Sequence, residues 1–321
     1  MRVLVVMIFL SWGIQAHAVQ VPGPLVETDW LAQHQGEVVM LDVRQDIRSF
    51  TAEPVYKKDP KTGKQIRVGV NGHIPGAILV NYKQVRATRK IDGQEVTRLI
   101  PVRTDFEKLM RQSGVNRDSA IVIVSKGQNN DHLTMATRLY WQLKYFGHDN
   151  MGILNGGVAA WLADGRQVAS GASKPLPGDW QAGAGRNAIL ASTADVAAAV
   201  KSGDAQLVDT RSLSQYLGTA KKPYVHAMGH IPGAKVYPYE LMNAAGESAR
   251  FLPAEKLGQL MEAMDIDGDA ATITYCNSGH LASGGWFIMS ELLGNKNVRL
   301  YDGSMHEWTL MKQPVKAMQM E

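Results

Sequence analysis

The chain has 321 residues, of which 45% are hydrophobic and 20% are charged, and its formal net charge is +4 at pH 7. This length suggests about two domains of ordinary size, and the composition excludes a disordered or fibrous protein. Lys and Arg are scattered along the chain rather than grouped in a basic run, so nothing indicates a nucleic-acid partner.

The first 18 residues are typical of a secretory signal peptide. Arg2 provides a positive charge, residues 3–14 form an apolar run, and Ala16-His17-Ala18 is a small-x-small cleavage site. The apolar run is shorter than the roughly 20 residues that a transmembrane helix needs. We therefore expect cleavage before Val19 and a mature protein in the periplasm, with no membrane anchor after cleavage.

The rest of the chain contains one unit twice. Four landmarks recur in the same order: a strand that ends in Asp-x-Arg (39–44 and 207–211), the sequence Gly-His-Ile-Pro-Gly-Ala (72–77 and 229–234), an apolar run (120–124 and 271–275), and a glycine segment followed by tryptophan (154–161 and 301–308). Such self-similarity predicts a tandem repeat. We expect domains at residues 25–168 and 191–321, joined by a linker at 169–190 whose segment 171–185 is rich in Gly, Pro, Ala and Ser.

Each unit has the pattern of an α/β domain. Short apolar strands alternate with helical stretches such as residues 193–201, which is typical of a mostly parallel sheet flanked by helices. In the second unit we expect strands at 271–275 and 298–300, and an amphipathic helix at 286–293 after a tight turn.

The two units differ at the end of their third matched strand. The second unit has Cys276 there, the only cysteine of the chain, whereas the first has Ser125. Matched landmarks of the two units are 151 residues apart before this point and 147 residues apart after it. We therefore expect the first unit's loop, at 126–135, to be four residues longer than its counterpart in the second unit. A lone cysteine in an exported protein indicates an intermolecular disulfide or a reactive free thiol, and an inert buried cysteine is the alternative.

The segment Cys-Asn-Ser-Gly-His-Leu-Ala that begins at Cys276 has the features of a reactive loop. It follows a strand, contains Gly279, and leads into a helix. Backbone N–H groups and the positive end of a helix stabilise a thiolate, which is the nucleophilic form of cysteine. Ligands of open α/β sheets bind at this carboxyl end of the strands.

Together these motifs resemble the two-domain rhodanese family of sulfurtransferases over residues 25–308. The resemblance implies two tandem rhodanese-like domains, of which the first is inactive, and it implies no cofactor and no metal. It also implies a ping-pong reaction in which Cys276 takes a sulfane sulfur from a donor such as thiosulfate, holds it as a persulfide, and passes it to a thiol or cyanide.

The resemblance also assigns roles to individual residues. Cys276 matches the nucleophile, and the loop that holds the persulfide matches Asn277, Ser278, Gly279, His280, Leu281 and Ala282. Asp209 and Arg211 match a structural pair that we expect to brace the loop region, and Gln215 is a possible substrate contact. Thiosulfate-using members have Arg at the position of Gln215 and Lys at that of Ser278. Both cations are therefore missing, which predicts weak thiosulfate binding, and His280 is the remaining candidate cation at mildly acidic pH.

Several alternatives are left open or disfavoured by the sequence. A sulfane-sulfur carrier or binding module with a periplasmic protein acceptor, or a transferase with a neutral donor, would suit a loop without cations. A phosphatase would need Cys-x5-Arg, but Ala282 occupies the Arg position. His73 and His230 occur in both units, only one of which has the cysteine, so we expect them to be structural. The chain also shows no zinc-ligand spacing.

Overall fold

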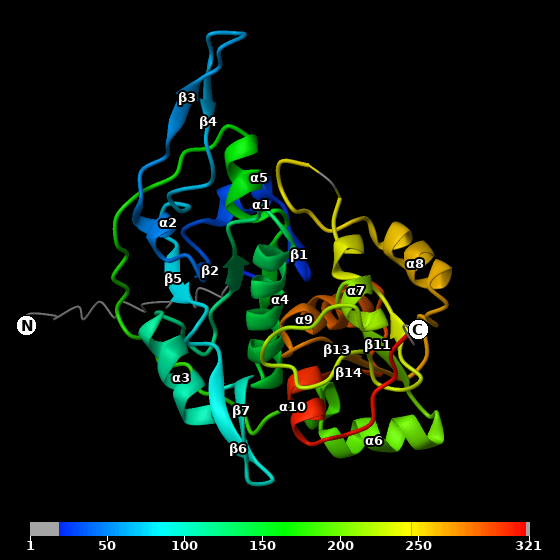
Figure 1. Ribbon diagram of the computed structural model, residues 1–321. Coiled ribbons are helices and arrows are strands. Elements are labelled where there is room, and N and C mark those ends of the chain that lie inside the picture. Colours follow the sequence, from blue (N-terminus) through cyan, green and yellow to red (C-terminus); the bar gives the residue numbers. More distant parts are fainter. Residues whose placement is uncertain (1–18, 245, 319–321) are drawn as a thin grey trace, which may run out of the picture.

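The computed structural model describes residues 19–244 and 246–318 (Figure 1). The signal peptide expected at residues 1–18 lies outside the described residues. Within the described ranges, no helix combines the length and the hydropathy needed to cross a bilayer.

The first domain is built on a five-stranded sheet with the strand order β1-β9-β8-β2-β5, in which all pairs are parallel. Two antiparallel hairpins, β3–β4 and β6–β7, are added to it. Its elements are β1 (Leu25–Val26), α1 (Thr28–His34), β2 (Val39–Arg44), α2 (Arg48–Thr51), β3 (Tyr56–Lys58), β4 (Gln65–Arg67), β5 (Ile78–Asn81), β6 (Ala87–Ile91), β7 (Gln94–Leu99), α3 (Arg103–Gln112), β8 (Ile121–Val124), α4 (Asn130–Tyr145), β9 (Met151–Leu154) and α5 (Gly157–Ala163).

The second domain repeats this sheet with the order β10-β14-β13-β11-β12, again with parallel pairs only. The α/β fold and the repeat predicted from the sequence are therefore confirmed. Its elements are the 3₁₀ helix η1 (Asn187–Ile189), β10 (Leu190–Ala191), α6 (Thr193–Ser202), β11 (Gln206–Asp209), α7 (Leu213–Leu217), β12 (Lys235–Val236), the 3₁₀ helix η2 (Tyr239–Leu241), α8 (Ala254–Ala263), β13 (Thr272–Tyr275), α9 (His280–Phe287), the π-helix η3 (Ile288–Leu292), β14 (Val298–Tyr301) and α10 (Ser304–Leu310).

The repeated motifs are explained by one buried ion pair in each domain. Arg211 donates from Nε and Nη2 to the Asp209 carboxylate at 2.5–3.1 Å, and Nη2 also donates to the Gly229 carbonyl at 2.8 Å. In the first domain Arg44 joins Asp42 and the Gly72 carbonyl in the same way. Arg211 therefore braces the Gly-His-Ile-Pro-Gly-Ala turn, whereas we expected the pair to brace the cysteine loop region.

The repeated histidines fasten the same turns to the helix before them. His73 stacks on Phe50 at 3.8 Å and lies 2.9 Å from the Phe50 carbonyl oxygen. His230 stacks on Tyr216 at 3.9 Å, and its Nδ1 lies 2.7 Å from the Tyr216 carbonyl oxygen. Both ring contacts are structural, as the repetition indicates.

Two expectations about the matched helices are corrected by the structure. The segment 125–129 between β8 and α4 is five residues long, and its counterpart 276–279 is four, so the loop contributes one of the four extra residues. The other three lie in α4, which has 16 residues against 13 in α9 and η3 together. The helix expected at 286–293 begins earlier, at His280. Its residues 286–289 are all fully buried, so no exposed polar face is present there, because α4 packs against α9.

The segment expected to be a linker lies along the first domain instead of spanning a gap (Figure 1). Ala169 pairs with His73, and the Gly178 N–H donates to the Arg111 carbonyl at 2.8 Å. Trp180 is 2% exposed and packs edge-on against Phe106.

The two domains meet through α4 and α9, the helices that follow the matched third strands (Figure 1). Small residues allow the close approach: a Cβ on Gly284 would lie 3.0 Å from the Thr134 methyl, and the Thr137 and Ser283 hydroxyls are 2.8 Å apart. Tyr140 packs against Phe287 at 4.9 Å. The faces of both sheets that look toward this interface share one continuous hydrophobic core.

One ion pair is buried within the interface. Arg138 of α4 is 0% exposed, and its Nη1 lies 2.5 Å from Oδ1 of Asp302, which follows β14. The same Nη1 donates to the Gly279 carbonyl at 3.2 Å, and the other Asp302 oxygen accepts the Ile100 N–H at 2.7 Å. Asp302 therefore connects the second domain to two separate parts of the first.

Replacing Asp302 by Asn should lower the free energy of unfolding by about 3–5 kcal/mol, because Arg138 would keep its buried charge without a counterion. Urea unfolding measures this loss. The control is Lys235→Ala, which removes the exposed pair with Asp265 and should cost at most about 1 kcal/mol. A loss for Asp302→Asn as small as that of the control would contradict this view of the interface.

Candidate active site

Cys276 borders a cavity between the two domains. Cys276 directly follows β13, where Asp209 at the end of β11 pairs with Tyr275. The residue is 1% exposed and borders a cavity of about 380 Å³ whose walls come from both domains. The thiol is therefore covered yet reachable from the cavity.

The loop around the thiol is held by the end of the neighbouring strand. The N–H groups of Cys276 and Gly279 both donate to the Ser304 hydroxyl, at 3.0 and 3.1 Å, and this hydroxyl donates to the Tyr301 carbonyl at 2.8 Å. The Ser278 N–H is directed at the sulfur of Cys276, with a distance of 3.4 Å. One loop amide thus stabilises negative charge on the sulfur, while Ser304 fixes the loop shape.

Sequence reasoning missed Ser304, although the repeat carries a signal for it. At the offset of 147 residues its counterpart in the first domain is Gly157, which has no hydroxyl. The two backbones match, with φ of 51° at Ser304 and 57° at Gly157, and in each copy the next N–H bonds to the carbonyl at the cysteine position. The copy with the thiol has the hydroxyl, and the copy with Ser125 lacks it.

Gly279 is required by its surroundings. Its φ is 70°, and a Cβ there would lie 2.5 Å from Nη1 of Arg138 and 2.6 Å from the Asp302 carboxylate. The interface ion pair therefore packs directly against the cysteine loop, and Gly279 gives it room.

Gln215 reaches the loop from α7. Its Oε1 accepts a hydrogen bond from Nδ2 of Asn277 at 2.7 Å, and both residues border the cavity. Asn277 is 4% exposed, so this bond fixes its side chain. Leu281 also borders the cavity, whereas Ala282 is buried and its carbonyl accepts a hydrogen bond from Thr274.

His280, the candidate cation at mildly acidic pH, borders the cavity but has a lowered pKa that disfavours a charge there. Burial, with the positive charge of Arg86 nearby, lowers the pKa of His280 to about 3. Its Nε2 lies 2.9 Å from the Thr134 hydroxyl and 3.3 Å from the Asp131 carbonyl. Because Thr134 donates its own proton to the Asn130 carbonyl, His280 donates to Thr134 as a neutral ring. His280 is an interface residue.

The cations at the cavity come mainly from the first domain, which sequence reasoning did not anticipate. Arg86, between β5 and β6, donates from Nη2 to the Ser278 hydroxyl at 2.8 Å and to the Ser278 carbonyl at 3.2 Å. Arg98 of β7 and Lys222 also border the cavity. No basic run in the sequence marks Arg86 or Arg98, because the Lys and Arg residues of the chain are scattered.

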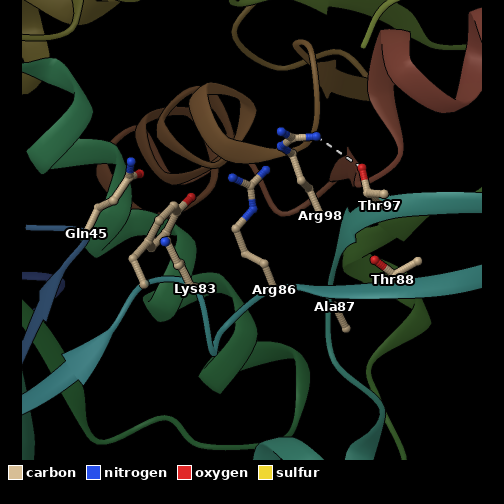
Figure 2. A pocket seen from close by; sticks show the side chains of 8 residues that line it. Gln45, Lys83, Arg86, Ala87, Thr88, Thr97 and Arg98 are labelled. Carbon is tan, nitrogen blue, oxygen red and sulfur yellow. Dashed lines mark hydrogen bonds between the residues drawn. The ribbon is translucent and has the colours of Figure 1, made fainter.

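A second hollow of about 420 Å³ adjoins this cavity and shares Gln45, Arg86 and Arg98 with it. Figure 2 shows Arg86 and Arg98 extending in the same direction from the chain around the β6–β7 hairpin, with Lys83 beside them. The two hollows therefore share the basic wall formed by Arg86 and Arg98.

The chain belongs to the family of the rhodanese-like domain, whose model matches residues 27–164 and 192–311. A proposed thiosulfate sulfurtransferase of Saccharopolyspora erythraea is 31% identical over 301 residues, which cover 91% of this chain and 95% of the relative. Sulfur carrier protein TtuD of Thermus thermophilus is 31% identical over 303 residues, with 89% and 94% covered.

Solved structures show the same fold. The crystal structure of SseA from Escherichia coli, from a study of 3-mercaptopyruvate sulfotransferases, superposes with a TM-score of 0.71 at 24% identity and covers 88% of this chain and 98% of its own. An anaerobic ergothioneine biosynthesis enzyme from Chlorobium limicola superposes with a TM-score of 0.72 at 19% identity, with 92% and 71% covered.

The neutral state of His280 predicts the direction of a pH effect on stability. The unfolded chain protonates this ring near its ordinary pKa of about 6.5, whereas the folded protein does so only near pH 3. Between these values the unfolded state binds more protons, so the free energy of unfolding should fall as the pH drops from 7 to 5. Desolvation also lowers the pKa values of half-buried His132 and of buried His148 and His306, which add to the same trend.

Urea unfolding at pH 7 and pH 5 should show a smaller fall for His280→Gln than for the wild type. An equal fall in the two proteins would show that His280 titrates alike in the folded and unfolded states.

Proposed function

We propose that this sulfurtransferase forms a persulfide on Cys276 and transfers its outer sulfur to a thiophilic acceptor. One observation carries the proposal: the only thiol of the chain borders the interdomain cavity, and the Ser278 N–H donates to its sulfur with an N···S distance of 3.4 Å. A persulfide extends the side chain by one sulfur atom, and the cavity provides the room for it.

The chemistry balances with thiosulfate as the donor. The Cys276 thiolate attacks the sulfane sulfur, the bond between the two sulfur atoms of thiosulfate breaks, and sulfite leaves with the electron pair. The acceptor, a thiol or cyanide, then attacks the outer sulfur and the Cys276 thiolate returns. The Ser278 N–H stabilises the anionic sulfur in both half-reactions.

A sulfur carrier is the second candidate. The relative from Thermus thermophilus is named as a sulfur carrier protein, and the 1% exposure of Cys276 would protect a stored persulfide from bulk solvent. A carrier loads once and waits for a protein acceptor, whereas an enzyme forms thiocyanate repeatedly from thiosulfate and cyanide. Thiocyanate in excess over protein selects the enzyme, and a single equivalent selects the carrier.

We also propose that the protein acts in the periplasm, on the basis of the signal-peptide pattern of residues 1–18. The N-terminal sequence of protein recovered from a periplasmic fraction tests this: Val19 as the first residue supports export, and an intact Met1 in the cytoplasmic fraction contradicts it.

Incubation with thiosulfate should increase the intact mass of the protein by one sulfur atom, and dithiothreitol should remove the increase. The variant Cys276→Ser should gain nothing, because its hydroxyl cannot accept the sulfur. Iodoacetamide labelling before the incubation provides the control that the thiol is free. A wild type that can be labelled but gains no sulfur from thiosulfate, 3-mercaptopyruvate or polysulfide would contradict the proposal.

A further inference from the structure

Three basic side chains surround the cavity above Cys276: Arg86 and Arg98 from the first domain and Lys222 from the second. Asp131 is the one carboxylate in the wall. Among residues 19–244 and 246–318, none of these three cations forms a salt bridge. Three cations against one carboxylate leave the cavity with uncompensated positive charge, which attracts an anion.

Arg86 is held in place but keeps unused donors. Its Nη2 is fixed by Ser278, and its guanidinium lies 5.4 Å from the centre of the Tyr82 ring. Its Nε is buried and has no hydrogen-bond partner among the described residues. A fixed guanidinium with free N–H groups suits an oxyanion, which accepts two parallel hydrogen bonds.

Arg98 is held by a strained backbone. Its φ is 68°, which is uncommon for a residue with a side chain. Nearby residues are fixed by the second domain: the Thr97 N–H donates to Nε2 of His306 at 3.3 Å, and the Ile100 N–H donates to Asp302 at 2.7 Å. Nη1 of Arg98 donates to the Thr97 hydroxyl at 3.1 Å (Figure 2). The guanidinium then lies over the Tyr224 ring at 3.9 Å. Such strain persists where the surroundings impose it, and it occurs often at ligand sites.

We propose that Arg86 and Arg98, together with Lys222, bind the anionic end of the sulfur donor, a sulfonate or a carboxylate. The inference rests on the proposed function and assigns donor recognition to the first domain, which has no thiol of its own. With thiosulfate, the sulfonate oxygens bind the guanidinium groups while the sulfane sulfur faces Cys276. When the sulfur–sulfur bond breaks, the electron pair stays on the departing sulfite, and the same cations stabilise that charge.

Steady-state kinetics test the role of each arginine. Arg86→Gln and Arg98→Gln should each raise KM for the anionic donor by about tenfold or more. Arg98→Gly removes the guanidinium and suits the positive φ, so it should show the same rise in KM, with the relieved backbone strain offsetting the lost contact with Tyr224. Lys90→Gln, on the same hairpin but outside the cavity, is the matched control and should leave KM unchanged. Measuring KM of each variant with thiosulfate and with 3-mercaptopyruvate shows whether binding of the sulfonate or of the carboxylate depends more on the arginines.

Alkylation of Cys276 separates the anion site from sulfur transfer. Iodoacetate and iodoacetamide have similar size, but only iodoacetate is an anion. The rate of Cys276 alkylation by iodoacetate, divided by the rate with iodoacetamide, therefore measures the attraction of the cavity for an anion. The ratio should fall about tenfold in Arg86→Gln and Arg98→Gln and stay constant in Lys90→Gln. If no donor loads the wild type but the ratio falls, the proposed function fails and the anion site stands. If both arginine variants match Lys90→Gln in KM and in the ratio, the anion site is overturned.

Discussion

The structure depends on one buried cation, the guanidinium of Arg138. A buried charge is tolerated only with a counterion and hydrogen bonds, and Arg138 finds them in Asp302, at 2.5 Å, and in the Gly279 carbonyl, at 3.2 Å. These partners lie in the second domain, one at the end of β14 and the other in the cysteine loop. A single side chain of the first domain therefore fixes α4 against α9 and holds the loop that presents Cys276.

This arrangement explains how a duplicated fold supports one site rather than two. Both copies keep the parallel sheet, the Asp-x-Arg pair and the histidine that fastens the repeated turn, because these features stabilise each domain. The copies differ at the candidate site, with Cys276 and Ser304 in the second domain against Ser125 and Gly157 in the first. The first domain instead adds the β6–β7 hairpin, which lies beside α10 (Figure 1). Arg98 of β7 and Arg86, just before β6, border the cavity that Cys276 also borders.

Sequence reasoning predicted the features that short motifs specify: the repeat, the parallel α/β domains and the position of Cys276 at a strand end. It placed the four extra residues in a loop, because an offset between landmarks does not show where a helix begins. It named His280 as the remaining candidate cation at mildly acidic pH, whereas desolvation and the nearby charge of Arg86 lower the pKa of this ring to about 3. Arg86 was missed because it meets Ser278 from 192 residues away, and such a contact follows from domain packing rather than from any local pattern.

A crystal structure of the protein after reaction with thiosulfate tests the central claim most directly. The account predicts one additional sulfur atom bonded to the sulfur of Cys276, within hydrogen-bonding reach of the Ser278 N–H and facing Arg86 across the cavity. An unmodified Cys276 in crystals of protein whose mass shows the added sulfur, or a sulfur atom directed away from the interdomain cavity, would contradict the account.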